Sequence, residues 1–187
     1  MDKHCRYHRR SIRLKGYDYS QPGAYFITIT TWQGEWLFGE ILENEMRLNP
    51  NGDLVAKILH SLQNYFPVQI DPWIVMPNHV HAIIHLEDSG TGEASAVKTD
   101  LNHSRRADAS PSANGTIPGT LGTIVQNYKS VTARQINRLR GTPGQPVWHR
   151  NYFERIIRND KELRLIQAYI EENPRNWLKD PEKLRNW

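Results

Sequence analysis

Two histidines stand on either side of one valine in a segment that is otherwise typical of a β-strand. Side chains alternate along a strand, so the rings of His79 and His81 share one face, about 7 Å apart along the chain. Ring nitrogens at that spacing can converge on one divalent cation, which can polarise a phosphoryl oxygen. Histidines spaced in this way more often simply face solvent. Here the opposite face of the strand is apolar, which favours a metal site. That face is formed by Val80, Ala82, Ile84 and Leu86.

A tyrosine near the end of the chain is the second residue that could do chemistry. Residues 160–173 predict a helix with an apolar stripe, and Tyr169 lies at its edge with Asn173 one turn further on. Such a tyrosine usually packs with its hydroxyl at the rim of the core. Alternatively, its phenol acts as a nucleophile activated by a metal or a base, and Asn173 offers an oxygen to a cation held by the two histidines. The predicted stripe consists of Leu163, Ile166 and Ile170.

Alternation and helical spacing predict the elements that would position these residues. The order strand, helix, paired strands, helix, strand, helix indicates an α+β protein. A ferredoxin-like antiparallel sheet with its helices on one face fits this order best, and the C-terminal helix would carry Tyr169. Asn159 and Glu162 have capping-box spacing at the start of that helix, and Pro174 is expected to end it. The predicted strands cover 25–32, 35–42, 73–76, 80–86 and 147–157, and the predicted helices cover 53–66, 121–139 and 160–173.

Length and composition limit the class of protein. A chain of 187 residues suits one domain, expected over 1–187, with a basic arm over 1–22 and a flexible polar insertion over 87–118. A single cysteine excludes an intramolecular disulfide and fits a reducing compartment such as the cytoplasm. The apolar runs are too short for a membrane span, and the first residues lack the apolar core of a signal peptide, so we expect no membrane partner.

The net charge of +4 is divided unevenly along the chain. Residues 1–16 carry a net charge of +5, residues 17–128 carry −7 and residues 129–187 carry +6. Such runs are often only solvated surface. Alternatively, two basic ends converge on a polyanion such as nucleic acid. The basic side chains expected to contact it are Arg6, Arg9, Arg10, Arg13, Lys15, Lys129, Arg134, Arg138, Arg150, Arg155 and Arg158.

Two segments of the chain resemble a known family of DNA-processing enzymes. The residues MPNHVH at 76–81 are similar to the histidine–hydrophobic–histidine motif of the HUH nucleases. Residues 148–174, which end in AYIEENP, resemble the C-terminal helix of the REP-associated tyrosine transposases, which are single-tyrosine transposases of the HUH superfamily. The resemblance extends over nearly the whole chain, because YFIT at 25–28 and GTLG at 119–122 also match.

The resemblance implies a role for each residue at a matched position. His79 and His81 would bind Mg²⁺ or Mn²⁺, and Asn173 would be the third ligand, at a position where relatives often have glutamine. Tyr169 would be the nucleophile. Tyr152 is a rival nucleophile, although its place in the motif NYFE favours packing on an edge strand.

The resemblance also implies a reaction and its partners. Single-stranded DNA would be cleaved and rejoined through a 5′-phosphotyrosine, on palindromic elements that fold into hairpins, by a cytoplasmic protein at the nucleoid. The active site would form within one chain or by exchange of the last helix in a homodimer.

Two other functions stay open: a noncatalytic nucleic-acid-binding module on the same fold, and a metal-stabilised structural protein that binds no nucleic acid. A covalent protein–DNA adduct would distinguish the enzyme from both.

Overall fold

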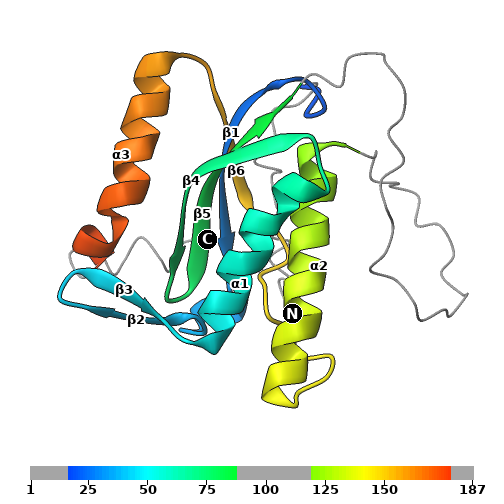
Figure 1. The fold of residues 1–187 in the computed structure, drawn as a ribbon, viewed down its shortest axis with the longest axis vertical. Helices are drawn as coiled ribbons and strands as arrows, with labels where there is room; N and C mark the ends of the chain where they lie inside the picture. The colour runs from blue at the N-terminus through cyan, green and yellow to red at the C-terminus, as the bar shows by residue number, and fades with distance from the viewer. Residues whose placement is uncertain (1–16, 88–118, 178–187) are drawn as a thin grey trace, which may run out of the picture.

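Figure 1 shows the fold in a computed structural model, which describes residues 17–87 and 119–177. Most of the predicted polar insertion lies outside the described residues. The predicted DNA-contacting residues of the arm also lie outside the described residues. They are Arg6, Arg9, Arg10, Arg13 and Lys15. None of the described helices has the length and apolar character that a membrane-spanning segment needs.

A four-stranded antiparallel sheet forms the centre of the fold. Its strands lie in the order β4-β5-β1-β6, and the chain forms them as strand, helix, two strands, helix, strand. This is the ferredoxin-like arrangement, so the predicted α+β class with an antiparallel sheet is confirmed. Strand β4 begins before the predicted residues, and β6 begins after them. The bounds are β1 Gly23–Thr30, β4 Val68–Met76, β5 His79–Leu86, β6 Phe153–Ile157, α1 Pro50–Ser61 and α2 Leu121–Arg140.

Helices cover both faces of the sheet. Figure 1 shows α1 and α2 on one side and α3 (Asp160–Asn176) on the other. The α1–α2 face holds the main core, which includes the apolar face predicted for β5. On the other face, Phe26 and Ile83 pack against two buried isoleucines of α3. The expectation of helices on one face holds for α1 and α2. Helix α3 departs from it, because Phe26 and Ile83 form a second apolar patch that must be covered.

A small hairpin precedes α1. It consists of β2 (Gly39–Leu42) and β3 (Glu45–Leu48), whereas the sequence pattern predicts only one extended stretch over 35–42. Glu43 and Asn44 join the two strands with positive φ at both positions, as a tight hairpin turn of the primed type requires. Glutamate is uncommon in that conformation, so the turn leaves only a weak signal in the sequence.

The first helix begins three residues earlier than its hydrophobic spacing predicts. Asn49 is its N-cap: Oδ1 accepts hydrogen bonds from the backbone N–H groups of Asn51 at 2.9 Å and Gly52 at 3.0 Å. Pro50 suits the first helical position, where its missing N–H costs no hydrogen bond. Glycine is required at position 52, because a Cβ there would lie 2.2 Å from the carbonyl oxygen of Phe38. The start of α1 is thereby held against the segment that follows β1.

The last helix has the predicted start and a later end. Oδ1 of Asn159 accepts the backbone N–H of Glu162 at 2.9 Å, as the capping box predicts. The Glu162 carboxylate in turn accepts the backbone N–H of Arg158 at 2.9 Å. The helix continues through Pro174 to Asn176, because a proline in the last turn removes only one backbone hydrogen bond. The expected stop at Pro174 is therefore wrong.

Candidate active site

The two histidines of the predicted pair lie at the start of β5, on the face of the sheet that α3 covers. Their Nε2 atoms are 2.9 Å apart. Both side chains are almost fully buried, with 2% of His79 and 3% of His81 exposed. Strand alternation places both rings on one face, as predicted, and the rings lean toward each other. The two Nε2 atoms, each a potential metal ligand, therefore converge on one point.

Each imidazole is held by a hydrogen bond at its other ring nitrogen. Nδ1 of His79 donates to Oδ1 of Asn78 at 2.8 Å. The Asn78 amide is itself oriented, because its Nδ2 donates to the carbonyl of Gly34 at 3.3 Å. Nδ1 of His81 lies 2.8 Å from the hydroxyl of Thr28, its neighbour across β1 and β5. When both Nδ1 atoms carry the protons, the Nε2 lone pairs face each other, an arrangement that a shared cation stabilises.

Both imidazoles are neutral near neutral pH. Burial lowers the pKa of His79 to about 3, although a hydrogen bond with the Asn173 side chain opposes the shift. Burial and the neighbouring His79 lower the pKa of His81 well below its ordinary value. Neutral imidazole is the form that binds metal ions, so the pair is in the ligating state without losing a proton.

Three residues at the end of α3 face the histidine pair at intervals of four positions, which places them on one side of the helix. They are Tyr169, Asn173 and Trp177. The Tyr169 hydroxyl lies 3.4 Å from Nε2 of His81, and the Asn173 side chain hydrogen-bonds His79. The ring centre of Trp177 lies 5.6 Å from that of His79. The structure therefore brings together all four residues that the sequence suggests as nucleophile and metal ligands.

A small apolar cluster and an ion pair hold α3 over the sheet. The ring of Phe26 stacks on that of His81, with 5.3 Å between centroids, and meets that of Tyr169 edge-on at 6.0 Å. Phe26 also packs against the buried isoleucines of α3. At the start of the helix, Arg155 of β6 pairs with Glu162 at 2.6 Å. Tyr169 is thus fixed beside the histidines while half of its side chain remains exposed to solvent.

The donor set at the pair fits a divalent cation with open coordination positions. Within residues 17–87 and 119–177, no three His, Cys, Asp or Glu side chains gather as a metal-ligand cluster. Among the described residues, the buried Asn173 is in place to supply an amide oxygen as a third protein ligand. Imidazole nitrogens are ligands that transition metals favour, whereas an amide oxygen and waters suit Mg²⁺ or Mn²⁺, so this mixed set leaves room for a divalent cation that keeps several waters. These ligands do not form the closed four-ligand set of a structural zinc site.

Other residues suggested by the sequence lie apart from the histidine pair. Tyr152 packs against the main core on the α1–α2 side of the sheet, so this rival nucleophile does not reach the pair. Nζ of Lys129 donates to the carbonyls of His149 at 2.7 Å and Arg150 at 3.0 Å, which ties α2 to the following segment. Burial lowers the pKa of Lys129 to about 8. Arg134 and Arg150 are exposed.

Sequence reasoning missed three residues that shape the site. Thr28 and Asn78 orient the imidazoles, and Trp177 packs beside them. Asn78 directly precedes the first histidine and was visible in the sequence, whereas Thr28 is revealed only by the strand register. The signal for Trp177 is its spacing of four residues from Asn173, which the expected helix end at Pro174 concealed.

Comparisons with known proteins give the chain a family. No family model matches the sequence. An uncharacterized protein of Haemophilus influenzae is 40% identical over 178 residues, which cover 93% of this chain and 92% of that protein. This chain belongs to the same family.

One solved structure identifies the fold, and a second is reported beside it. A REP-associated tyrosine transposase bound to a REP hairpin matches with a TM-score of 0.53 and 18% identity, over 86% of this chain and 72% of that chain. A transposase candidate from Deinococcus radiodurans R1 matches with a TM-score of 0.43 and 16% identity, over 85% of this chain and 95% of that chain. The first likeness shows that this chain has the fold of a REP-associated tyrosine transposase. The resemblance seen in the sequence is thereby confirmed at the level of the fold.

Proposed function

We propose that this protein cleaves and rejoins single-stranded DNA, with Tyr169 as nucleophile and a divalent cation at His79 and His81. The observation that carries the proposal is the position of the Tyr169 hydroxyl, 3.4 Å from Nε2 of His81. A phenol, two imidazole donors and an amide oxygen within contact of one another are suited to attack on a phosphodiester. The fold shared with a REP-associated tyrosine transposase supports the same assignment.

The proposed reaction exchanges one phosphate ester for another. The Tyr169 oxygen bonds to phosphorus while the bond from phosphorus to the 3′ oxygen of the neighbouring nucleotide breaks. The phenol loses its proton and the released 3′ oxygen gains one, which leaves a 5′-phosphotyrosine and a free 3′-OH. Attack of a 3′-OH on the phosphotyrosine joins the strands again. No external energy source is needed, because each ester bond that breaks is replaced by another.

The side chains around the pair prepare the site for this chemistry. Thr28 and Asn78 hold the imidazoles so that both Nε2 atoms face one point, and Asn173 is the amide that would add an oxygen ligand. A bound Mg²⁺ or Mn²⁺ would neutralise the charge on the phosphate oxygens. Phe26 keeps the Tyr169 ring in place, so the nucleophile is already positioned before DNA arrives.

A DNA hairpin with unpaired flanks is the proposed substrate. The transposase with the same fold is bound to a REP hairpin, and a hairpin offers both a stem for docking and single strands for cleavage. The exposed Arg134 and Arg150, together with the basic residues before position 17, would contact phosphates, and affinity would fall steeply with salt. The protein would act in the cytoplasm at the nucleoid, as a monomer or as a helix-exchanged homodimer.

The test is a covalent adduct on a denaturing gel. Wild-type protein with Mn²⁺ and a hairpin oligonucleotide from the flanks of its own gene should give a protein–DNA band, and Tyr169→Phe should abolish it. Tyr152→Phe is the matched control, because Tyr152 packs against the main core on the other face of the sheet, and it should keep the band. An adduct that survives Tyr169→Phe would contradict the assignment. DNA binding without any adduct would favour the noncatalytic module.

A further inference from the structure

Trp36 is an aromatic side chain that the core does not explain. Its side chain is 62% exposed, more than that of any other aromatic residue among those that the structure describes. It stands between Glu35, which is also exposed, and the buried pair Leu37 and Phe38. The two residues that follow it point into the core, so the indole is directed outward on a short segment beside the sheet.

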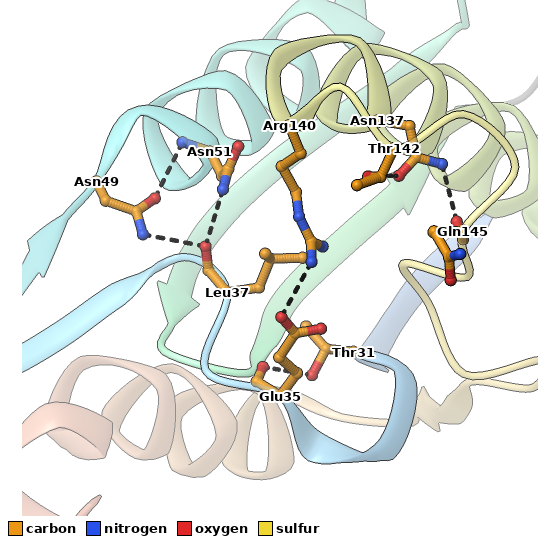
Figure 2. A network of polar contacts seen from close by, with 9 residues as sticks. All are labelled: Thr31, Glu35, Leu37, Asn49, Asn51, Asn137, Arg140, Thr142 and Gln145. Carbon is orange, nitrogen blue, oxygen red and sulfur yellow. Dashed lines mark hydrogen bonds and ion pairs between the residues drawn. The ribbon is translucent and has the colours of Figure 1, made fainter.

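The segment on both sides of Trp36 is fixed by polar contacts, several of which are drawn in Figure 2. Before it, the Glu35 carboxylate pairs with Arg140 at 3.2 Å, and its carbonyl accepts the Thr31 hydroxyl at 2.8 Å. After it, the carbonyl of Leu37 accepts amide N–H groups from Asn49 at 3.1 Å and from Asn51 at 3.3 Å. The exposed indole therefore stands on a rigid support, and a ligand that packs on it would lose little of its binding energy in ordering this backbone.

A row of ring contacts connects Trp36 to the candidate active site. The Trp36 ring meets that of Trp177 edge-on, with 5.8 Å between centroids. Trp177 is buried and packs on His79 at 5.6 Å. His79 contacts His81, whose ring lies 5.2 Å from that of Tyr169. Trp36 is thus the solvent-exposed end of a row that starts at the nucleophile.

We propose that Trp36, supported by Trp177, stacks an unpaired base of the DNA strand that Tyr169 attacks. The inference rests on the function proposed above. The rings of His81, His79 and Trp177 stand between Tyr169 and Trp36, so the stacked base belongs to the single strand that leads to the reacting phosphate. Aromatic side chains bind unpaired bases in this way with little regard to sequence. Arg140 forms an ion pair with Glu35 beside Trp36. The positive charge of the guanidinium offsets the carboxylate charge that would otherwise repel the phosphates of the strand.

The surroundings of Trp36 favour a base over a protein partner. Protein interfaces bury a contiguous apolar surface of several hundred square ångströms. Gln33 and Glu35, on the same segment, are exposed and polar, and the segment's other exposed tryptophan, Trp32, stacks on His149, so the Trp36 indole offers a small flat apolar surface. One planar base matches that shape.

The experiment compares two labelled DNA hairpins with the same stem, one with unpaired thymidine arms and one with blunt ends. Trp36→Ala should weaken binding of the armed hairpin roughly tenfold, as expected for loss of one stacking contact, and leave the blunt hairpin unchanged. Trp36→Phe should keep most of the affinity, because it retains an aromatic ring. Tyr65→Ala is the matched control, since Tyr65 is an exposed aromatic residue at the far end of α1, and it should bind both probes as wild type does.

The outcomes separate this proposal from the function on which it rests. If the wild type forms the Tyr169 adduct but Trp36→Ala binds the armed hairpin normally, the stacking surface is wrong and the proposed function stands. Equal weakening for both probes, or a change in sedimentation without a change in DNA binding, also overturns the stacking surface. If the wild type binds neither probe, both proposals fail. Thermal melting of Trp36→Ala should match the wild type, because the indole lies outside the core.

Discussion

The phenolic oxygen of Tyr169 lies 3.4 Å from Nε2 of His81, although 88 residues separate the two in the sequence. Tyr169 comes from a helix whose apolar stripe fills a small second core, and His81 comes from a strand whose other face builds the main core. The two faces of the sheet therefore have different uses. The α1–α2 face holds the main core, and the α3 face both adds a second core and positions the candidate active site.

Removal of one imidazole should abolish cation binding. We expect Mn²⁺ to raise the Tm of the wild type, because a ligand that binds only the folded state stabilises it, by about 2.7 kcal/mol at one hundred times Kd. His81→Ala should lose that response. His60→Ala, which removes an exposed histidine of α1, should keep it. Thermal melts with and without Mn²⁺ make the comparison, and a normal response of His81→Ala would show that the cation binds elsewhere.

Thr28 should control how well His81 binds a cation. Thr28→Val keeps a side chain of similar shape but removes the hydroxyl that lies 2.8 Å from Nδ1 of the buried His81. We expect a loss of about 1–3 kcal/mol in the free energy of unfolding and a fall of roughly 10- to 100-fold in Mn²⁺ affinity. Urea unfolding and calorimetric titration measure the two effects. Thr30→Val, on the same face of β1 and opposite His79, is the matched control. Equal effects of the two substitutions would exclude an orienting role for Thr28.

The metal-free protein should lose stability as the pH falls below about 6.5. In the unfolded chain a histidine takes up a proton near its ordinary pKa of 6.5, whereas burial lowers the pKa of His79 in the folded protein to about 3. Unfolding therefore takes up protons between these two values, and the free energy of unfolding decreases as the pH falls, by up to about 1.4 kcal/mol per pH unit for one histidine. The pKa of His81 is lowered in the same direction, so it adds to the slope.

Urea unfolding between pH 5 and 6.5 tests this dependence, because most carboxylates stay ionised in that range. Replacement of both histidines by glutamine should flatten the slope. An unchanged slope in the double variant would mean that the buried pair does not carry the pH dependence. Mn²⁺ should also flatten the slope in the wild type, because the cation and the proton compete for the same nitrogens.

The parts of the site that the sequence predicts correctly depend on local periodicity. Alternation along residues 79–86 separates the histidine face from the apolar face, and the helical stripe of residues 160–173 places Tyr169 and Asn173 on one side. Both patterns are fixed by backbone geometry within a single element. The contact between Tyr169 and His81 is not local, and before the structure only the family resemblance pointed to it.

The parts that the sequence does not predict depend on packing between elements. Nothing within α3 indicates which face of the sheet it covers, because an apolar stripe fits either face. The choice is made by Phe26 and Ile83, which form an apolar patch only when β1 and β5 are paired. The role of Thr28 depends on the same register. Trp177 was missed for a different reason, since Pro174 removes only one hydrogen bond near the helix end.

Loosening α3 should impair the site while the rest of the fold remains. Ile170 is fully buried in the second core beneath Tyr169, and Ile170→Ala should cost about 2–5 kcal/mol because it leaves a cavity there. Amide hydrogen exchange in α3 should accelerate, and the rate of adduct formation should fall, because Tyr169 is no longer held beside His81. Leu165→Ala, on the exposed side of the same helix, should change the stability by less than about 0.5 kcal/mol.

A second control separates the effect of displacing Tyr169 from the effect of lowering the overall stability. Ile136 is fully buried on α2, in the main core on the other face of the sheet, so Ile136→Ala should cost a similar amount. At a temperature where both variants remain folded, Ile136→Ala should form the adduct at nearly the wild-type rate and Ile170→Ala should not. Equal rates in the two variants would mean that the packing of α3 does not limit the chemistry. A selective loss in Ile170→Ala would show that the second core holds Tyr169, the proposed nucleophile, against the histidine pair.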